Sequence, residues 1–238
     1  MKKKHQRLPT IAVVGSGDLQ NWDPRMSLAE ELGQKLITEG YVLVTGGRGG
    51  VMEAACRGAR SSRRWEPGRI IGILPGSDPT EANEFVDVVI PTGFGEGRNF
   101  VVAHADAVIA VGGGAGTLAE MAIGWRLNRL LIGFRVPGWS GGMSDHALDE
   151  RARFPSIPDD QVHGVDMVDE AIDTLKSRFG QYQAARDALK EWGDPDADKS
   201  IRRPPGPGPG GINDDGNDDG NDDGDEPPPG RPKLFLLD

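Results

Sequence analysis

Three glycine-rich turns carry the residues whose types and spacing could do chemistry. They are Gly15-Ser16-Gly17, Gly46-Gly47-Arg48 and the longer run Gly112–Thr117. Because glycine has no Cβ, it lets backbone N–H groups come close to an anion. A helix that follows such a turn adds unpaired N–H donors and the positive end of its dipole. Together the three turns predict a site for a nucleotide or another phosphorylated small molecule.

The third turn gives the most specific prediction. We expect a phosphate group to be held by Gly113, Gly114, Ala115, Gly116 and Thr117. Glu120 follows in the first turn of the predicted helix. Its carboxylate either lies beside the ligand or reaches back to Thr117 as the partner in a capping box. The first two turns are expected to complete the nucleotide site through Gly15, Ser16, Gly17, Gly46, Gly47 and Arg48.

Arg98 is the second charged candidate in the predicted site. It stands at the start of a short predicted helix, in the run Gly97-Arg98-Asn99. A guanidinium group there can bind phosphate or carboxylate through two parallel hydrogen bonds, and a solvated surface arginine is the alternative. Two familiar motifs are missing: the chain has no G-x-x-x-x-G-K-[ST], and Gln20 stands where a dinucleotide site would have its third glycine. Neither a P-loop ATPase nor a standard dinucleotide site is therefore predicted.

The elements that must position these residues alternate between strand and helix. Apolar runs predict strands at Thr10–Val14, Tyr41–Thr45, Arg69–Leu74, Val86–Ile90, Ala107–Val111 and Leu130–Phe134. Helical patterns cover Met26–Thr38, Val51–Ser61, Asn99–Ala105, Gly116–Leu127 and Val168–Phe179. Ser27 and Glu30 have the spacing of a capping box for the first of these helices. The alternation predicts an α/β fold: a Rossmann-like three-layer domain with a mostly parallel sheet, which binds ligands at the carboxyl ends of its strands.

The composition divides the chain into four parts. We expect a flexible N-terminus at 1–8, the Rossmann-like nucleotide-binding domain at 9–180, and a C-terminal helix within 181–199. Residues 200–238 are acidic and rich in Pro and Gly, so they bury too little apolar surface to fold and are expected to be a disordered tail. Inside the domain, 135–160 is rich in Pro and Gly and predicts a long loop. This loop is either a poorly ordered insertion or a flap over the site.

The acidic charge is concentrated in the tail. Nine acidic and three basic side chains after residue 202 account for −6 of the formal charge of −10. The folded part is only mildly acidic, and without clustered Lys and Arg we expect no nucleic-acid partner. The tail also matches a calcium-loop pattern through Asp215, Asn217, Asp219, Gly220 and Glu226. A four-residue repeat of Asn, Asp and Gly meets this pattern by chance, so no metal site is expected.

Cysteine content and hydropathy predict a soluble, cytoplasmic protein. Cys56 is the one cysteine of the chain, in a run of small residues that favours a buried apolar position. The N-terminus is basic but lacks the apolar stretch of a secretory signal. No run approaches the roughly 20 apolar residues of a membrane span, so we expect no membrane partner.

Three segments stand out in combination: TGGRGGVMEAACRGA at 45–59, GRN at 97–99 and ADAVIAVGGGAGTLAEM at 105–121. Together they resemble the LONELY GUY-like (SLOG) superfamily, and the resemblance extends over about 9–179. The best-known branch hydrolyses cytokinin riboside 5′-monophosphates and carries the motif P-G-G-x-G-T-x-x-E with an upstream Arg-Lys. The resemblance implies catalytic roles for Arg98 and Glu120. Two positions depart from that branch, because Gly112 replaces the motif's Pro and Asn99 its Lys.

The sequence is more similar to a bacterial branch of uncharacterised members, some of them misnamed lysine decarboxylases. That branch also resembles molybdenum-cofactor carrier proteins, which bind their ligand without hydrolysing it. The resemblance therefore leaves open an N-glycosidase acting on nucleoside 5′-monophosphates and a non-catalytic nucleotide or molybdenum-cofactor carrier. No lysine stands at a strand end or glycine turn, which argues against pyridoxal-phosphate chemistry, and no cofactor is expected.

The family resemblance also implies a homodimer or higher oligomer with sites near the subunit interface. Met121 and Trp125 lie on the helix after the third turn. These two side chains could belong either to such an interface or to the core of one subunit.

Overall fold

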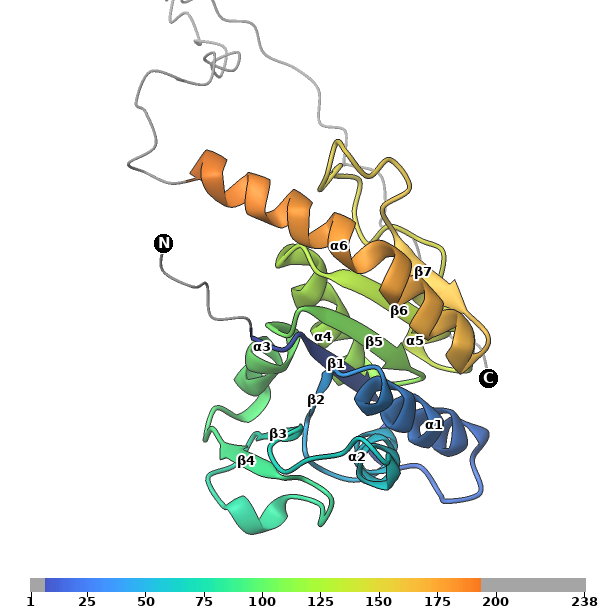
Figure 1. The fold of residues 1–238 in the computed structure, drawn as a ribbon, viewed down its shortest axis with the longest axis vertical. Helices are drawn as coiled ribbons and strands as arrows, with labels where there is room; N and C mark the ends of the chain where they lie inside the picture. Colours follow the sequence, from blue (N-terminus) through green and yellow to red (C-terminus); the bar gives the residue numbers. More distant parts are fainter. Residues whose placement is uncertain (1–6, 194–238) are drawn as a thin grey trace, which may run out of the picture. The chain divides into compact units, whose positions relative to one another are not determined.

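A seven-stranded, all-parallel sheet organises the part of the chain that the computed structural model describes, residues 7–193 (Figure 1). The strands are β1 Thr10–Gly15, β2 Val42–Thr45, β3 Ile70–Leu74, β4 Val88–Pro91, β5 Ala107–Val111, β6 Leu130–Phe134 and β7 Val162–Val165. Their order across the sheet is β4-β3-β2-β1-β5-β6-β7, and each neighbouring pair is parallel. The chain therefore winds outward in both directions from β1 and β5, as in a doubly wound fold.

Helices cover both faces of this sheet. They are α1 Pro24–Thr38, α2 Val51–Ser61, α3 Arg98–Ala103, α4 Ala115–Arg126, α5 Trp139–Met143 and α6 Val168–Gly193, with single 3-10 turns at Pro79–Glu81 and Gly95–Gly97. The alternation of side chains along β1 separates the two faces. Ile11 and Val13 pack in a core with α1, α2 and α6, whereas Ala12 and Val14 pack with α3 and α4. The predicted Rossmann-like three-layer α/β fold is confirmed.

Three details of the predicted elements were wrong. The capping box at Ser27 is not formed, because α1 already begins at Pro24. Asp23 is the residue that caps it, and its carboxylate accepts a hydrogen bond of 2.9 Å from the Arg25 N–H. An Asp-Pro pair is a strong start signal, since proline at the first helical position loses no hydrogen bond.

The other two details concern the second half of the chain. β7 was missed, because a four-residue strand with His163 and Gly164 at its centre has little β-branched character. The helices expected on either side of Gly180 form the single helix α6, in which that glycine costs only about 1 kcal/mol. None of the described helices has both the length and the apolar character needed to cross a membrane. The N-terminal residues 1–6 and the predicted tail with its calcium-loop pattern lie outside the described residues.

Candidate phosphate-binding site

The candidate site lies where the order of the strands reverses. β1 and β5 pair directly through Gly15 and Val111, so the turns that follow them meet at one edge of the sheet. A Cβ on Gly15 would lie 2.3 Å from the Val111 carbonyl oxygen and 2.7 Å from Val51 at the start of α2. Glycine is therefore required here to bring two strands and a helix together. The crevice at such a switch point is where doubly wound folds bind ligands.

The first two glycines of the third turn have structural roles. Gly112 and Gly113 have φ angles of 65° and 97°, a region that favours glycine. The Gly112 N–H donates to the Ser140 hydroxyl at 2.7 Å, and the Gly113 N–H donates to the Ser16 hydroxyl at 3.0 Å. Gly113, which the sequence predicts as a phosphate ligand, thus uses its N–H to hold the turn against β1.

The next four residues leave their N–H groups available for a ligand. α4 begins at Ala115 with Gly114 as its N-cap, and its first backbone bond runs from Leu118 N–H to the Gly114 carbonyl at 3.1 Å. The N–H groups of Gly114, Ala115, Gly116 and Thr117 therefore have no partner within the helix. These four residues line one cleft, with the positive end of the helix dipole behind them. This geometry suits an anion such as a phosphate group.

Arg98 and Glu120 form an ion pair on the same cleft. Arg98 Nη1 donates to Glu120 Oε1 at 3.0 Å, and the two side chains are 15% and 6% exposed. Gly46 makes this placement possible, because a Cβ there would lie 2.2 Å from Arg98 Nη1. The predicted surface-arginine alternative for Arg98 is thus wrong: the guanidinium is largely buried against a carboxylate. Glu120 is also not the capping partner of Thr117, since the cap of α4 is Gly114.

Burial raises the pKa of Glu120 to about 7, and the negative charge of Glu96 adds to the rise. The Arg98 guanidinium acts in the opposite direction and offsets only part of it. Arg98 therefore does not keep Glu120 ionised at neutral pH, because loss of hydration outweighs the ion pair. Near neutral pH, this carboxyl group can either donate or accept a proton.

The cleft that these groups share has a volume of about 1150 Å³. Ten predicted residues line it: Gly15, Ser16, Gly17, Arg48, Arg98, Gly114, Ala115, Gly116, Thr117 and Glu120. The other three, Gly46, Gly47 and Gly113, lie behind this lining in the described structure and shape it through their backbones. The sequence analysis missed Asp18, Gly49, Met52, Glu96, Asn99, Ala119 and Ile123. Several of these adjoin predicted residues in the sequence, a signal that could have found them.

The loop after β6 is neither a poorly ordered insertion nor a flap over the cleft. It contains the short helix α5, which packs against the back of the third turn. Trp139 N–H donates to the Gly113 carbonyl at 2.9 Å, and Ser140 N–H to the Gly112 carbonyl at 3.0 Å. The Ser140 hydroxyl also donates to the Phe134 carbonyl at 2.7 Å. This segment fixes the turn from outside the cleft.

Comparison with known proteins identifies the family of this chain. The model of the SLOG cluster4 family matches residues 8–170, which include both strands of the switch point and every residue of the cleft. The chain belongs to the SLOG cluster4 family. The resemblance read from the three sequence segments is thereby confirmed.

Three individual proteins are similar to this chain, and two of them are described as binding or carrying the molybdenum cofactor. An uncharacterized protein of Archaeoglobus fulgidus is 35% identical over 147 residues, which make up 61% of this chain and 93% of that protein. The molybdenum cofactor binding protein of Rippkaea orientalis is 33% identical, with a TM-score of 0.59, over 72% of this chain and 97% of its own. The molybdenum cofactor carrier protein of Chlamydomonas reinhardtii is 31% identical, with a TM-score of 0.57, over 74% of this chain and 99% of its own.

Proposed function

We propose that this protein binds a phosphorylated small molecule in the cleft and carries it without altering it, with a molybdenum-cofactor-type pterin phosphate as the cargo class. Two similar structures are of a molybdenum cofactor binding protein and a molybdenum cofactor carrier protein. The cofactor is cargo in this proposal, held through its phosphate by the N–H groups from Gly114 to Thr117. A cleft of about 1150 Å³ is large enough for a ligand of this size.

One observation carries the proposal: the fold does not require glycine at positions 114 and 116. Apart from the adjoining residues and the backbone of α4 itself, no atom of the described chain lies within 4 Å of a Cβ built on either residue, and neither has a positive φ. Glycine inside a helix costs about 0.5 to 1 kcal/mol relative to alanine, so Gly116 destabilises α4 with no gain in packing. Both residues face the cleft. A ligand that closely approaches the backbone explains why both positions are glycine.

The test compares ligands that differ only in the phosphate. Titration calorimetry with neopterin phosphate against neopterin, and with GMP against guanosine, should show binding only for the phosphorylated member of each pair. Thr117→Val keeps the shape of a side chain that packs against Gly113 but removes its hydroxyl. We expect a roughly tenfold loss of affinity for phosphorylated probes, equivalent to about 1.4 kcal/mol. Equal binding of neopterin and its phosphate would refute this placement of the ligand.

A second function, hydrolysis of nucleoside 5′-monophosphates at the N-glycosidic bond, is favoured by the Arg98–Glu120 pair. In this case the phosphate occupies the same N–H groups, and Glu120 orients the ribose or the attacking water. Its carboxylate would stabilise an oxocarbenium-like transition state, as at other glycosidic bonds. A pKa of about 7 also suits Glu120 to proton transfer near neutral pH.

The two functions separate in one assay. The protein is incubated with a panel of nucleoside monophosphates, and free base and ribose 5-phosphate are measured. Release that disappears in Glu120→Ala and in Arg98→Ala supports the hydrolase. Tight binding without release from any member of the panel supports the carrier.

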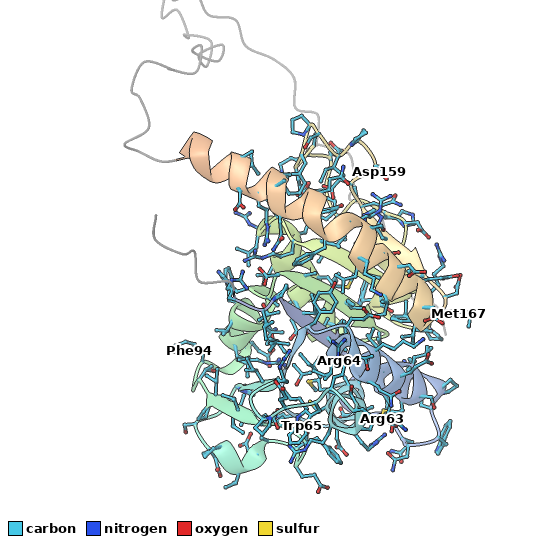
Figure 2. The ribbon with its side chains drawn as sticks, in the orientation of Figure 1. Arg63, Arg64, Trp65, Phe94, Asp159 and Met167 are labelled. Atoms are coloured by element: carbon cyan, nitrogen blue, oxygen red, sulfur yellow. The ribbon has the colours of Figure 1, made fainter. Side chains whose placement is uncertain are left out.

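We further propose a homodimer in which the face of α3 meets a second copy. Phe100 and Val101 on α3 are 55% and 38% exposed, and Phe94 on the preceding turn is 68% exposed. Figure 2 shows Phe94 at the margin of the domain, between β4 and α3. Met121 and Trp125 are excluded as contacts, because both are buried in the core. Light scattering should report a dimer that Phe100→Glu converts to a monomer; a monomeric wild-type protein would refute this arrangement.

A further inference from the structure

The wall of the cleft formed by Glu96 and Asn99 has a hydrogen-bonding capacity that the phosphate site does not use. Glu96 lies in the 3-10 turn Gly95–Gly97, and its exposed carboxylate lines the cleft. Asn99 follows in α3 and is 4% exposed. Its Nδ2 donates to Glu96 Oε2 at 3.4 Å, which orients the amide. With the nitrogen facing the carboxylate, the amide oxygen is turned away from Glu96.

That oxygen is unsatisfied. Asn99 Oδ1 is buried and has no hydrogen-bond partner among the described residues, although Asn99 lines the cleft. Buried carbonyl oxygens are almost always paired. An unpaired amide oxygen beside a ligand cleft therefore indicates that the ligand supplies the hydrogen-bond donor. Reversing the amide would not help, because it would place the oxygen against the Glu96 carboxylate and leave a buried N–H unpaired.

The cleft therefore has two chemically opposite parts. The start of α4 offers N–H donors and the positive end of a helix dipole, which suit a phosphate. The wall at Glu96 and Asn99 carries acceptor atoms that lack a partner for a ligand's N–H groups: the exposed Glu96 carboxylate and, buried beside it, the amide oxygen of Asn99. Anionic groups of a ligand are repelled from this wall, and adjacent N–H groups are attracted to it. A matching ligand carries a phosphate at one end and two neighbouring N–H donors at the other.

We propose that Glu96 and Asn99 recognise the 2-amino-4-oxo edge that guanine and pterins share. This edge presents a ring N–H beside an exocyclic amino group, so two donors can meet the Glu96 carboxylate while the second amino hydrogen points to Asn99 Oδ1. Adenine and cytosine place a ring acceptor beside their amino group, and hypoxanthine lacks the amino group. The inference rests on the proposed function, because it assigns the heterocycle of the same phosphorylated ligand.

The test uses nucleotides that differ only at this edge. Titration calorimetry of the full-length protein with GMP, IMP and AMP should show GMP binding at least tenfold more tightly than the other two. Glu96→Gln should reduce the GMP-to-IMP affinity ratio to near one while IMP affinity stays within about twofold. Glu84→Gln removes one exposed charge outside the cleft and should leave the ratio unchanged. Neopterin phosphate, measured beside GMP, decides whether the pterin or the purine is the better match.

Each outcome separates this inference from the proposed function. Equal affinity for GMP, IMP and AMP, with guanosine not binding, would overturn the inference and leave the phosphate site in place. Failure of every phosphorylated probe to bind would overturn both. Asn99→Leu removes the orphan oxygen and should lower the ratio as Glu96→Gln does. If this variant does not fold, the Glu96→Gln result still decides.

Discussion

The glycine-rich turns after β2 and β5 are similar in sequence but have different roles in the structure. In the turn after β2, the glycines are used by the protein itself: Gly46 makes room for Arg98, and Gly47 packs against Gly72 and Leu74. Gly50, at a φ of 63°, lies against the carbonyl oxygens of the first turn. In the turn after β5, Gly112 and Gly113 are also required by their surroundings, whereas a Cβ on Gly114 or Gly116 would point into open space.

The first N–H group of the helix after each turn differs in the same way. Val51 N–H, at the start of α2, donates to the Ser16 carbonyl at 2.9 Å. At the start of α4, the Ala115 N–H has no partner among the described residues, and the residues from Gly114 to Thr117 line the cleft. A glycine-rich turn before a helix is therefore not enough to predict an anion site. The space beyond the glycines, and whether the first N–H groups already have partners, distinguish a structural turn from a binding one.

The largest effect that tests this contrast is expected from Gly50→Ala. A Cβ on Gly50 would lie 2.3 Å from the Ser16 carbonyl oxygen and 2.6 Å from that of Gly17, and the backbone has a positive φ. We expect the free energy of unfolding to fall by about 3 kcal/mol or more, as measured by chemical denaturation. Gly114→Ala is the matched control in the third turn and should change it by less than about 0.5 kcal/mol. A similar loss for both variants would break the contrast between the turns.

A second test concerns the buried carboxyl of the binding turn. The pKa of Glu120 is raised from 4.5 to about 7, so the folded protein holds a proton that the unfolded chain releases between these values. Stability from this group is complete below about pH 4.5, falls as the pH rises, and is lost above about pH 7. Glu120→Gln should remove this pH-dependent difference, on the order of 3 kcal/mol, in denaturation at several pH values.

Glu84→Gln is the control for that experiment, because its carboxylate is exposed. It should follow the wild-type pH profile. A Glu120→Gln profile parallel to the wild type across this range would mean that Glu120 titrates normally, and that the Arg98–Glu120 pair is ionised throughout.

A third, smaller effect tests the structural half of the binding turn. The buried Ser140 hydroxyl accepts from Gly112 N–H and donates to the Phe134 carbonyl, both at 2.7 Å. Ser140→Ala leaves the buried Gly112 N–H unpaired, whereas the Phe134 carbonyl keeps its bond of 2.8 Å from the Val136 N–H. The variant should cost about 1 to 2 kcal/mol of unfolding free energy. Ser177→Ala, which removes an exposed hydroxyl on α6, should cost less than about 0.5 kcal/mol. Equal costs would show that α5 does not support the turn.

The sequence predicted the fold and much of the cleft because both follow local patterns. Runs such as Ala107–Val111 end at glycine, and their order along the chain alternates with helices, so the parallel sheet and its binding edge followed directly. Glu120 and Arg98 were placed at the site from their positions next to the turns. The structure brings these two side chains into contact, although 22 positions separate them along the chain; their role at a ligand site stays a prediction.

What the sequence could not predict depends on contacts between distant segments. Nothing in the order of residues shows that Ser16 takes the Gly113 N–H, or that Ser140 takes that of Gly112. The pKa of Glu120 likewise depends on how deeply α3 and α4 bury it. The orphan oxygen of Asn99 is invisible in the sequence, because it is defined by the absence of a partner among the described residues.

Gly116→Ala is expected to have the smallest effect on stability, but it tests the binding turn most directly. The variant should stabilise the fold and weaken ligand binding at the same time. Gly116→Ala places a methyl group in open space on α4 and should raise the free energy of unfolding by about 0.5 to 1 kcal/mol. The same methyl group keeps a phosphate from the backbone and should weaken binding of phosphorylated probes about tenfold or more. Gly180→Ala, also helical and without neighbours within 4 Å, lies away from the cleft and should stabilise without affecting binding. If both variants stabilise and neither weakens binding, then the glycine at 116 does not serve a ligand, and the third turn is as structural as the second.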